Sequence, residues 1–100
     1  MTELDFGGFD WDEGNSTKSS KKHGVASEAI EALFLAGPLV LDDPRHSGIE
    51  KRFIAVGQTS AGRWLVVAFT LRFKQGVKLI RPISARYMHT KEARRYEDLH

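Results

Sequence analysis

The sequence predicts an α+β domain with a helical and loop-rich first third, an antiparallel β-meander of three to four strands, and a C-terminal helix. Apolar residues recur at helical spacing within residues 27–34. Runs rich in β-branched and aromatic residues follow one another after residue 51, and short turns containing glycine separate them. One hundred residues correspond to a single domain, residues 1–100, with one modest core.

The first third contains one segment with a clear helical pattern. Residues 1–11 are acidic and aromatic, which indicates either an extended segment that docks through its rings or a partly ordered terminus. Residues 12–22 contain no large apolar side chain and predict a loop. Ser27 is the expected N-cap of a helix that runs to Phe34, and the Gly-Pro pair at 37–38 ends it.

Four extended segments follow, and a helix closes the chain. The strands are expected at residues 39–41, 52–58, 63–72 and 77–85. The run 63–72 is almost continuously apolar, as in a central strand that is covered on both faces. Pro82 cannot donate a ladder hydrogen bond, so its strand is expected to be an edge strand or to be bulged there. Thr90 is the expected cap of a helix from Lys91 to about Leu99.

Composition narrows the possible functions. The chain has no cysteine, which excludes disulfides, a thiolate nucleophile and cysteine-ligated metal sites. No apolar run approaches the roughly 18 residues that cross a bilayer, so we expect a cytoplasmic protein without a membrane partner. Residues 1–17 carry five acidic and no basic side chains, whereas residues 18–100 carry 15 basic and eight acidic ones. A basic body of this kind favours association with polyanions.

Two arginines stand in the last expected strand, at positions 81 and 86. A buried arginine is costly unless it is paired, so each is expected either to bind an anion such as phosphate or to form an ion pair. The expected ion-pair partners are Glu50, Glu97 or Asp98. Residues five apart project from opposite faces of a regular strand, so Arg81 and Arg86 can line one site only if a bulge at Pro82 resets the alternation.

Two histidines are candidates for proton transfer. His23 follows Lys21 and Lys22, and neighbouring cations favour the neutral imidazole that accepts a proton. The alternative is a capping or packing histidine before a left-handed Gly24. His46 stands in a polar loop and fits either the same acid–base role or a plain exposed position.

Glu50 and Arg52 occupy alternate positions of one strand and therefore point to the same face. They are expected to form either an ion pair or part of a catalytic site. Tyr96 can donate a phenolic proton or stack on a base, or it can pack the terminal helix against the domain.

The spacing of the histidines does not indicate a metal site. The four histidines show no helical i, i+4 pair and no HExxH motif. Asp42 and Asp43 can bind a divalent cation, but a turn before Pro44 explains them equally well. We therefore expect no metal and no other cofactor.

Several motifs together resemble those of the BrnT family of small ribonuclease toxins, over almost the whole chain. They are Trp11-Asp12, Lys22-His23-Gly24-Val25, Glu50-Lys51-Arg52-Phe53 leading to Gly57, the run from Ile80 to Arg86, and Tyr96-Glu97. The resemblance implies a RelE-like fold and metal-independent cleavage of single-stranded RNA, such as messenger RNA, by attack of a 2′-hydroxyl. It also implies a type II toxin–antitoxin pair.

The resemblance implies roles for individual residues. Catalysis would involve His23, Glu50, Arg52, Arg81 and Arg86, with the arginines on the phosphate and His23 or Glu50 transferring protons. RNA would be bound by Lys22, Arg52, Arg81, Arg86 and Tyr96. The implied partner is a small DNA-binding, BrnA-like antitoxin in a hetero-oligomer, through which alone the toxin would contact DNA.

The chain departs from the family pattern at two places. Residues 14–17 replace helix-forming residues by Gly, Asn, Ser and Thr, and Pro82 stands where an apolar strand residue is expected. Either change can shift the candidate site residues relative to one another. The alternative function is therefore a non-catalytic RNA- or antitoxin-binding module of the same fold.

Overall fold

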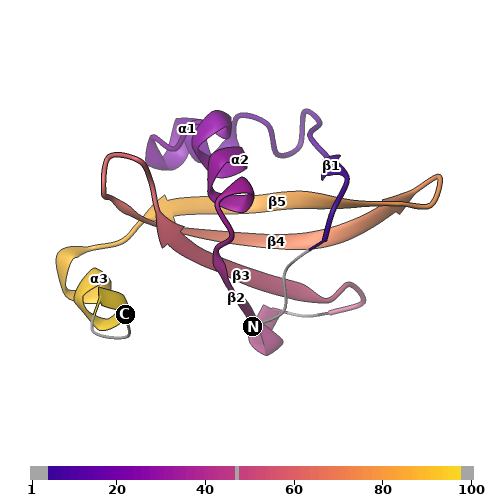
Figure 1. Cartoon of the computed structure of the whole chain (residues 1–100). Coiled ribbons are helices and arrows are strands. Elements are labelled where there is room, and N and C mark those ends of the chain that lie inside the picture. The colour runs from indigo at the N-terminus through magenta and orange to yellow at the C-terminus, as the bar shows by residue number, and fades with distance from the viewer. Residues whose placement is uncertain (1–4, 47, 98–100) are drawn as a thin grey trace.

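A five-stranded sheet is the main feature of the computed structural model, which describes residues 5–46 and 48–97 (Figure 1). The strands are β1 (Gly8–Phe9), β2 (Leu39–Asp42), β3 (Arg52–Gln58), β4 (Trp64–Lys74) and β5 (Val77–Tyr87). Their order across the sheet is β1-β5-β4-β3-β2. Strands β2 to β5 pair antiparallel, whereas β1 pairs parallel to β5.

The predicted arrangement of a helical first third followed by an antiparallel meander of three to four strands is wrong. Strand β1 precedes the helices, and its parallel pairing makes the sheet mixed. Only two residues form β1, and they pair with Leu79 and Ile80, some 70 positions later in the chain. A strand of two residues has no periodicity of its own, so no local pattern could have indicated it.

In the described part of the chain, three helices and one 3-10 turn accompany the strands. The helices are α1 (Lys18–His23), α2 (Ser27–Leu35) and α3 (Thr90–Glu97), and the 3-10 turn η1 is Pro44–His46. Helix α2 begins at Ser27 itself, so the N-cap is Ala26 and the predicted capping role of Ser27 is wrong. The expected end of the last helix at Leu99 lies outside the described residues. Within the described part of the chain, no helix has the length and hydrophobicity to cross a membrane.

Helix α1 lies in a segment that was expected to be a loop. It has only six residues and no side-chain hydrogen bond at its N-cap, as its poor helix formers suggest. It ends at Gly24, whose φ of 67° is the left-handed conformation that glycine adopts without steric cost. A helix this short is stabilised by tertiary contacts rather than by propensity.

The core lies between α2 and one face of the sheet. Phe34 of α2 meets Phe69 of β4 edge to face, with ring centroids 4.9 Å apart. Helix α2 also approaches β3 closely at Gly57, where an added Cβ atom would lie 2.6 Å from the Leu33 side chain. Any larger residue at position 57 would therefore push α2 away from the sheet.

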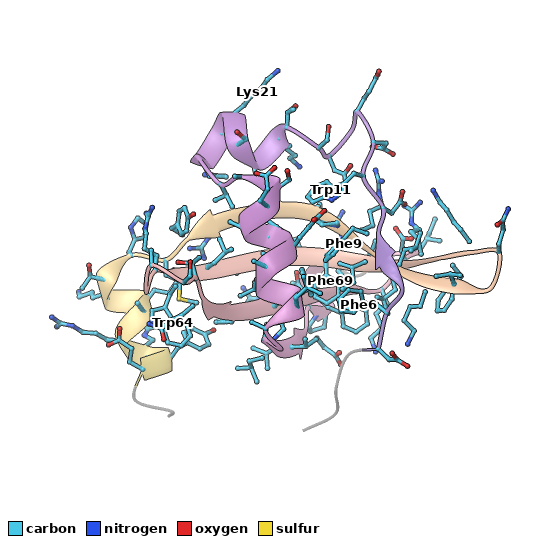
Figure 2. All side chains as sticks on the ribbon, turned by 45° about the horizontal axis from the view of Figure 1, so that its top comes forward. Phe6, Phe9, Trp11, Lys21, Trp64 and Phe69 are labelled. Carbon is cyan, nitrogen blue, oxygen red and sulfur yellow. The ribbon has the colours of Figure 1, made fainter. Side chains whose placement is uncertain are left out.

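The segment before α1 docks through its rings, in agreement with one of the two expectations for it. Phe9 lies 5.9 Å from Phe34 between ring centroids, and Phe6 lies 5.4 Å from Phe9. The indole N–H of Trp11 donates a hydrogen bond of 2.7 Å to Glu31 of α2. Figure 2 shows Phe6, Phe9 and Phe69 gathered beside α2, while Lys21 points away from the sheet.

The opposite face of the sheet, called the open face below, is covered at one end by α3 (Figure 1). There Trp64 packs at 6.0 Å from Tyr96 and donates a hydrogen bond of 3.2 Å to Glu97. Val66 and Ala68 are only half-buried, so β4 is not covered on both faces as expected. Its apolar run contributes alternately to the core and to this open face.

A β-bulge in β5 places two arginines on the open face, beside a third from β3. Ala68 pairs with Ser84 and Phe69 pairs with Pro82, which leaves Ile83 as the extra residue. The bulge resets the alternation, so that Arg81 lies opposite Thr70 and Arg86 lies opposite Val66. Thr70 and Val66 are an even number of positions apart and share a face. Arg52 of β3 also pairs with Thr70 and therefore joins them.

Polar side chains complete the outer edge of β5 beyond the short β1. The Asn15 amide donates hydrogen bonds to the carbonyls of Asp10 (3.0 Å) and Pro82 (2.8 Å). The Ser19 hydroxyl of α1 accepts a hydrogen bond of 2.7 Å from the backbone N–H of Ala85. Both side chains are buried. Polar side chains of residues 12–22 thus supply the hydrogen bonds that a longer β1 would otherwise make.

We expect Ser19→Ala to lower the free energy of unfolding by about 1–3 kcal/mol, because it leaves the buried N–H of Ala85 without its acceptor. Urea unfolding measures the change. Ser20→Ala is the matched control, since Ser20 is exposed on the same helix and the substitution changes helix propensity equally. Equal stabilities of the two variants would contradict the importance of this bond.

A second contact attaches the segment before α1 to β5. Arg81 donates hydrogen bonds of 2.9 and 3.2 Å to the two oxygens of Asp12, and its Nη1 lies 3.5 Å from Asp10. The hydrogen bonds from Arg81 lower the pKa of Asp12, and the backbone N–H of Gly14 adds to this effect. The same pair raises the pKa of Arg81, which stays charged.

The Asp12 contribution to stability depends on pH. A carboxyl group whose pKa is lowered in the folded state stabilises the fold above its unfolded value and loses this contribution as pH falls through the folded one. We expect Asp12→Asn to unfold at a lower temperature than the wild type at pH 7. The difference should shrink as pH falls below about 4. Thermal unfolding across this range tests it, with exposed Glu13→Gln as the control that shows no such difference.

Candidate functional site

Three hollows adjoin one another around the open face. The central hollow, of about 300 Å³, is lined by His23, Asp43, His46, Arg52, Ile54, Val66, Ala68, Ser84, Ala85 and Arg86. The Lys18 hollow, of about 190 Å³, is lined by Gly14, Asn15, Lys18, Glu50, Arg52, Thr70, Arg72, Arg81, Pro82 and Ile83. The α3 hollow, of about 560 Å³, is lined by Arg86, His89, Lys91, Glu92 and Arg95.

The central hollow contains an imidazole that is oriented by a carboxylate. Nδ1 of His46 lies 3.1 and 3.2 Å from the two oxygens of Asp43. The side chain of Asp43 is only 12% exposed, whereas that of His46 is 65% exposed. Because Nδ1 faces the carboxylate, it carries a proton, and Nε2 is the nitrogen that can exchange a proton with a ligand.

Local sequence explains this geometry. Asp43 comes directly after β2 and donates a backbone hydrogen bond of 3.0 Å to the carbonyl of Arg52. Pro44 fixes the backbone for the single turn η1, in which the N–H of His46 donates to the carbonyl of Asp43 at 3.3 Å. A turn of this kind brings side chains three positions apart onto the same side. The Asp-x-x-His spacing therefore forms the pair.

Three other elements add a polar group each to the central hollow. His23 is the last residue of α1, Arg52 begins β3, and Arg86 lies near the end of β5. These are three of the residues predicted for catalysis. The Ser19 bond to Ala85 positions α1, and with it His23, beside β5.

Arg86 is oriented by a carboxylate of α3. It donates hydrogen bonds of 2.7 and 2.9 Å to the two oxygens of Glu92. These bonds raise the pKa of Arg86 and lower the pKa of Glu92, although partial burial opposes both effects. The Arg86 side chain is 45% exposed. A guanidinium group has five N–H donors, so three remain beside the pair with Glu92.

The Lys18 hollow contains two further paired arginines. Arg72 donates hydrogen bonds of 2.6 and 3.1 Å to Glu50, so the predicted Glu50 carboxylate orients Arg72. Arg81 faces Asp12 and Asp10, as described above, and its side chain is only 18% exposed. Arg52 lines both this hollow and the central one.

Both predicted arginines of β5 therefore have ion-pair partners, but not the expected ones. Arg81 pairs with Asp12 and Asp10, and Arg86 pairs with Glu92. Of the three partners expected from the sequence, Glu50 pairs with Arg72 and Glu97 accepts a bond from Trp64. Asp98 lies outside the described residues.

The remaining predicted residues lie outside these three hollows. Lys22 is exposed on α1, and Tyr96 packs its ring near Trp64. Sequence reasoning missed the link between Asp43 and His46, as well as Lys18 and Arg72. The i, i+3 spacing next to Pro44 was the available signal for the first, whereas the other two depend on tertiary packing. Among the described residues, no three His, Asp or Glu side chains form a metal-ligand cluster.

The sequence matches the model of a known protein family. The model of the family described as "Ribonuclease toxin, BrnT, of type II toxin-antitoxin system" matches residues 11–92. Among curated proteins, none matches the chain. The family match spans the central and Lys18 hollows and all of the α3 hollow except Arg95. The chain therefore belongs to the BrnT family of ribonuclease toxins, which implies an RNA target and an antitoxin partner.

Proposed function

We propose that this chain is an endoribonuclease toxin that cleaves single-stranded RNA, such as messenger RNA, in the central hollow by metal-independent attack of a 2′-hydroxyl. One observation supports this most directly. Two imidazoles, of His23 and His46, line the same hollow as two arginines, Arg52 and Arg86. Such a set supplies a base, an acid and cations for the charge that develops on the phosphate.

The proposed reaction needs two proton transfers. A base removes the proton of the 2′-hydroxyl, and the oxygen attacks the adjacent phosphorus. The bond from phosphorus to the 5′-oxygen breaks, and an acid gives that oxygen a proton. The products are a 2′,3′-cyclic phosphate and a 5′-hydroxyl, with no external reactant consumed.

We assign the acid to His46 and the base to His23. The Asp43 carboxylate binds Nδ1 of His46, which leaves Nε2 to donate a proton to the leaving 5′-oxygen. His23 is the second imidazole of the same hollow and is assigned to accept the proton of the 2′-hydroxyl. Glu50 is the less suitable base, because Arg72 occupies both its oxygens and it lines the neighbouring hollow.

Arg52 and Arg86 are proposed to bind the scissile phosphate. Arginine remains charged at any relevant pH and can donate two parallel hydrogen bonds to a phosphate. The less exposed Arg81 is assigned to attaching the Asp12 segment, so we propose for it an indirect role.

We also propose that an antitoxin regulates this activity, because the family is one of toxin–antitoxin systems. A small DNA-binding, BrnA-like antitoxin would bind the toxin in a hetero-oligomer in the cytoplasm, and the toxin would contact DNA only through it. The basic balance of residues 18–100 supports association with RNA or with an acidic partner segment.

We expect the purified chain to cleave single-stranded RNA to 2′,3′-cyclic phosphate ends in excess chelator. His46→Ala, His23→Ala and Arg86→Ala should each lower the rate at least about 100-fold, because each removes an acid, a base or a phosphate ligand. Gel analysis of end-labelled RNA measures the rate and the end groups.

Lys21→Ala is the control for lost charge, since Lys21 points away from the sheet (Figure 2). RNA binding without cleavage by the folded wild-type chain would refute the enzyme assignment. It would favour the alternative, a non-catalytic RNA- or antitoxin-binding module.

Asp43→Asn tests the proposed positioning of His46. We expect kcat to fall at least about tenfold, because the amide can present its NH2 group to Nδ1 and so no longer holds His46 in the required tautomer and orientation. Asp42→Asn is the matched control, since Asp42 is the exposed neighbour and pairs only distantly, at 3.8 Å, with Lys51. Added imidazole should restore part of the activity of His46→Ala while Asp43 is intact, but not that of Asp43→Asn. Equal activities of the two aspartate variants would rule out the positioning role.

A further inference from the structure

Shared arginines connect the three hollows into a row. Arg52 lines both the Lys18 hollow and the central hollow, and Arg86 lines both the central hollow and the α3 hollow. Both outer hollows contain basic side chains that the central hollow lacks, Lys18 and Arg72 in one and Lys91 and Arg95 in the other. Of the three hollows, only the central one contains two histidines.

We propose that this row is one path for a single RNA strand, with a phosphate subsite in each outer hollow. The central hollow takes the scissile phosphate, and the Lys18 and α3 hollows take the phosphates of the neighbouring nucleotides. This inference rests on the proposed function, since it identifies the central hollow as the place of cleavage. It adds that a substrate needs at least three consecutive phosphates to fill the whole path.

The ion pairs along the row are compatible with phosphate binding. Glu50 occupies two donors of Arg72, and Glu92 occupies two donors of Arg86. Each guanidinium group therefore keeps three N–H donors for a phosphate. Both side chains are more than 40% exposed, so an incoming strand can reach them.

The lining of the central hollow indicates an unpaired strand. Half-buried aliphatic side chains of Ile54, Val66 and Ala68 lie among its charged groups. An unstacked base or a ribose can rest against them, whereas the stacked bases of a duplex cannot. None of the three hollows is lined by Phe, Tyr or Trp, so stacking on a large ring does not select a base there. Binding should therefore depend mainly on phosphates and tolerate many sequences.

Binding of 2′-O-methyl oligonucleotides tests the path separately from cleavage, because they lack the attacking hydroxyl. Fluorescence anisotropy at several salt concentrations gives the slope of log affinity against log salt. We expect this slope to steepen from the dinucleotide to the tetranucleotide, which carries three phosphates, by about 0.7 for each added contact. Longer strands should gain little more.

Variants assign the outer subsites. Lys18→Ala and Arg95→Ala should each reduce the tetranucleotide slope by about 0.7. The matched controls are Lys21→Ala on α1 and Arg94→Ala on α3, which remove the same charges from exposed positions outside the three hollows. They should keep the wild-type slope.

The outcomes separate the path from the proposed function. The path is overturned if the tetranucleotide does not bind, if its slope equals that of the dinucleotide, or if Lys18→Ala and Arg95→Ala behave like their controls. RNA cleavage with any of these results would leave the nuclease assignment intact. The expected slopes without cleavage of unmodified RNA would support the path and reject the nuclease assignment.

Discussion

The candidate site depends on one irregularity of the sheet, the bulge at Ile83 in β5. In a regular strand without this bulge, Arg81 and Arg86, which are five positions apart, would project from opposite faces, and one of them would point towards the core. The bulge also interrupts the regular edge of β5, where β1 has already ended. Asn15 and Ser19 satisfy the backbone groups there, at Pro82 and Ala85. The hydrogen bond of Ser19 in turn positions α1, which brings His23 and Lys18 to the hollows.

Carboxylates orient the arginines of the open face. Arg72, Arg81 and Arg86 each donate two hydrogen bonds to one carboxylate, from Glu50, Asp12 and Glu92 respectively. Exposed ion pairs contribute little to stability, so their main effect is to restrict where each guanidinium group points. A ligand then meets cations whose orientation is already restricted, which reduces the entropy lost on binding.

Burial distinguishes the structural ion pair of Arg81 from the pairs whose arginines are open to solvent. The Arg81 side chain is 18% exposed and lies between two aspartates of the N-terminal segment. Arg72 and Arg86 are more than twice as exposed. His46 shows the same division within one pair, because its partner Asp43 is largely buried while the ring is open to solvent. In this pair the largely buried carboxylate fixes the geometry, and the exposed ring can reach a ligand.

Local pattern in the sequence determined the strands from residue 39 onward, helix α2 and the identity of the basic residues. Strands β3 to β5 have apolar runs long enough to show their period, and turns at Gly62 and Gly76 separate them. The motifs around His23, Arg52 and Arg86 also indicated the family and three residues of the central hollow. The tertiary structure decided the rest. Strand β1 and α1 are too short to show a period, and the partners of Arg81, Pro82 and Ala85 depended on the bulge and on the path of residues 10–19 over β5. Those contacts join residues more than 60 positions apart, and no local propensity can specify which side chains meet across such a distance.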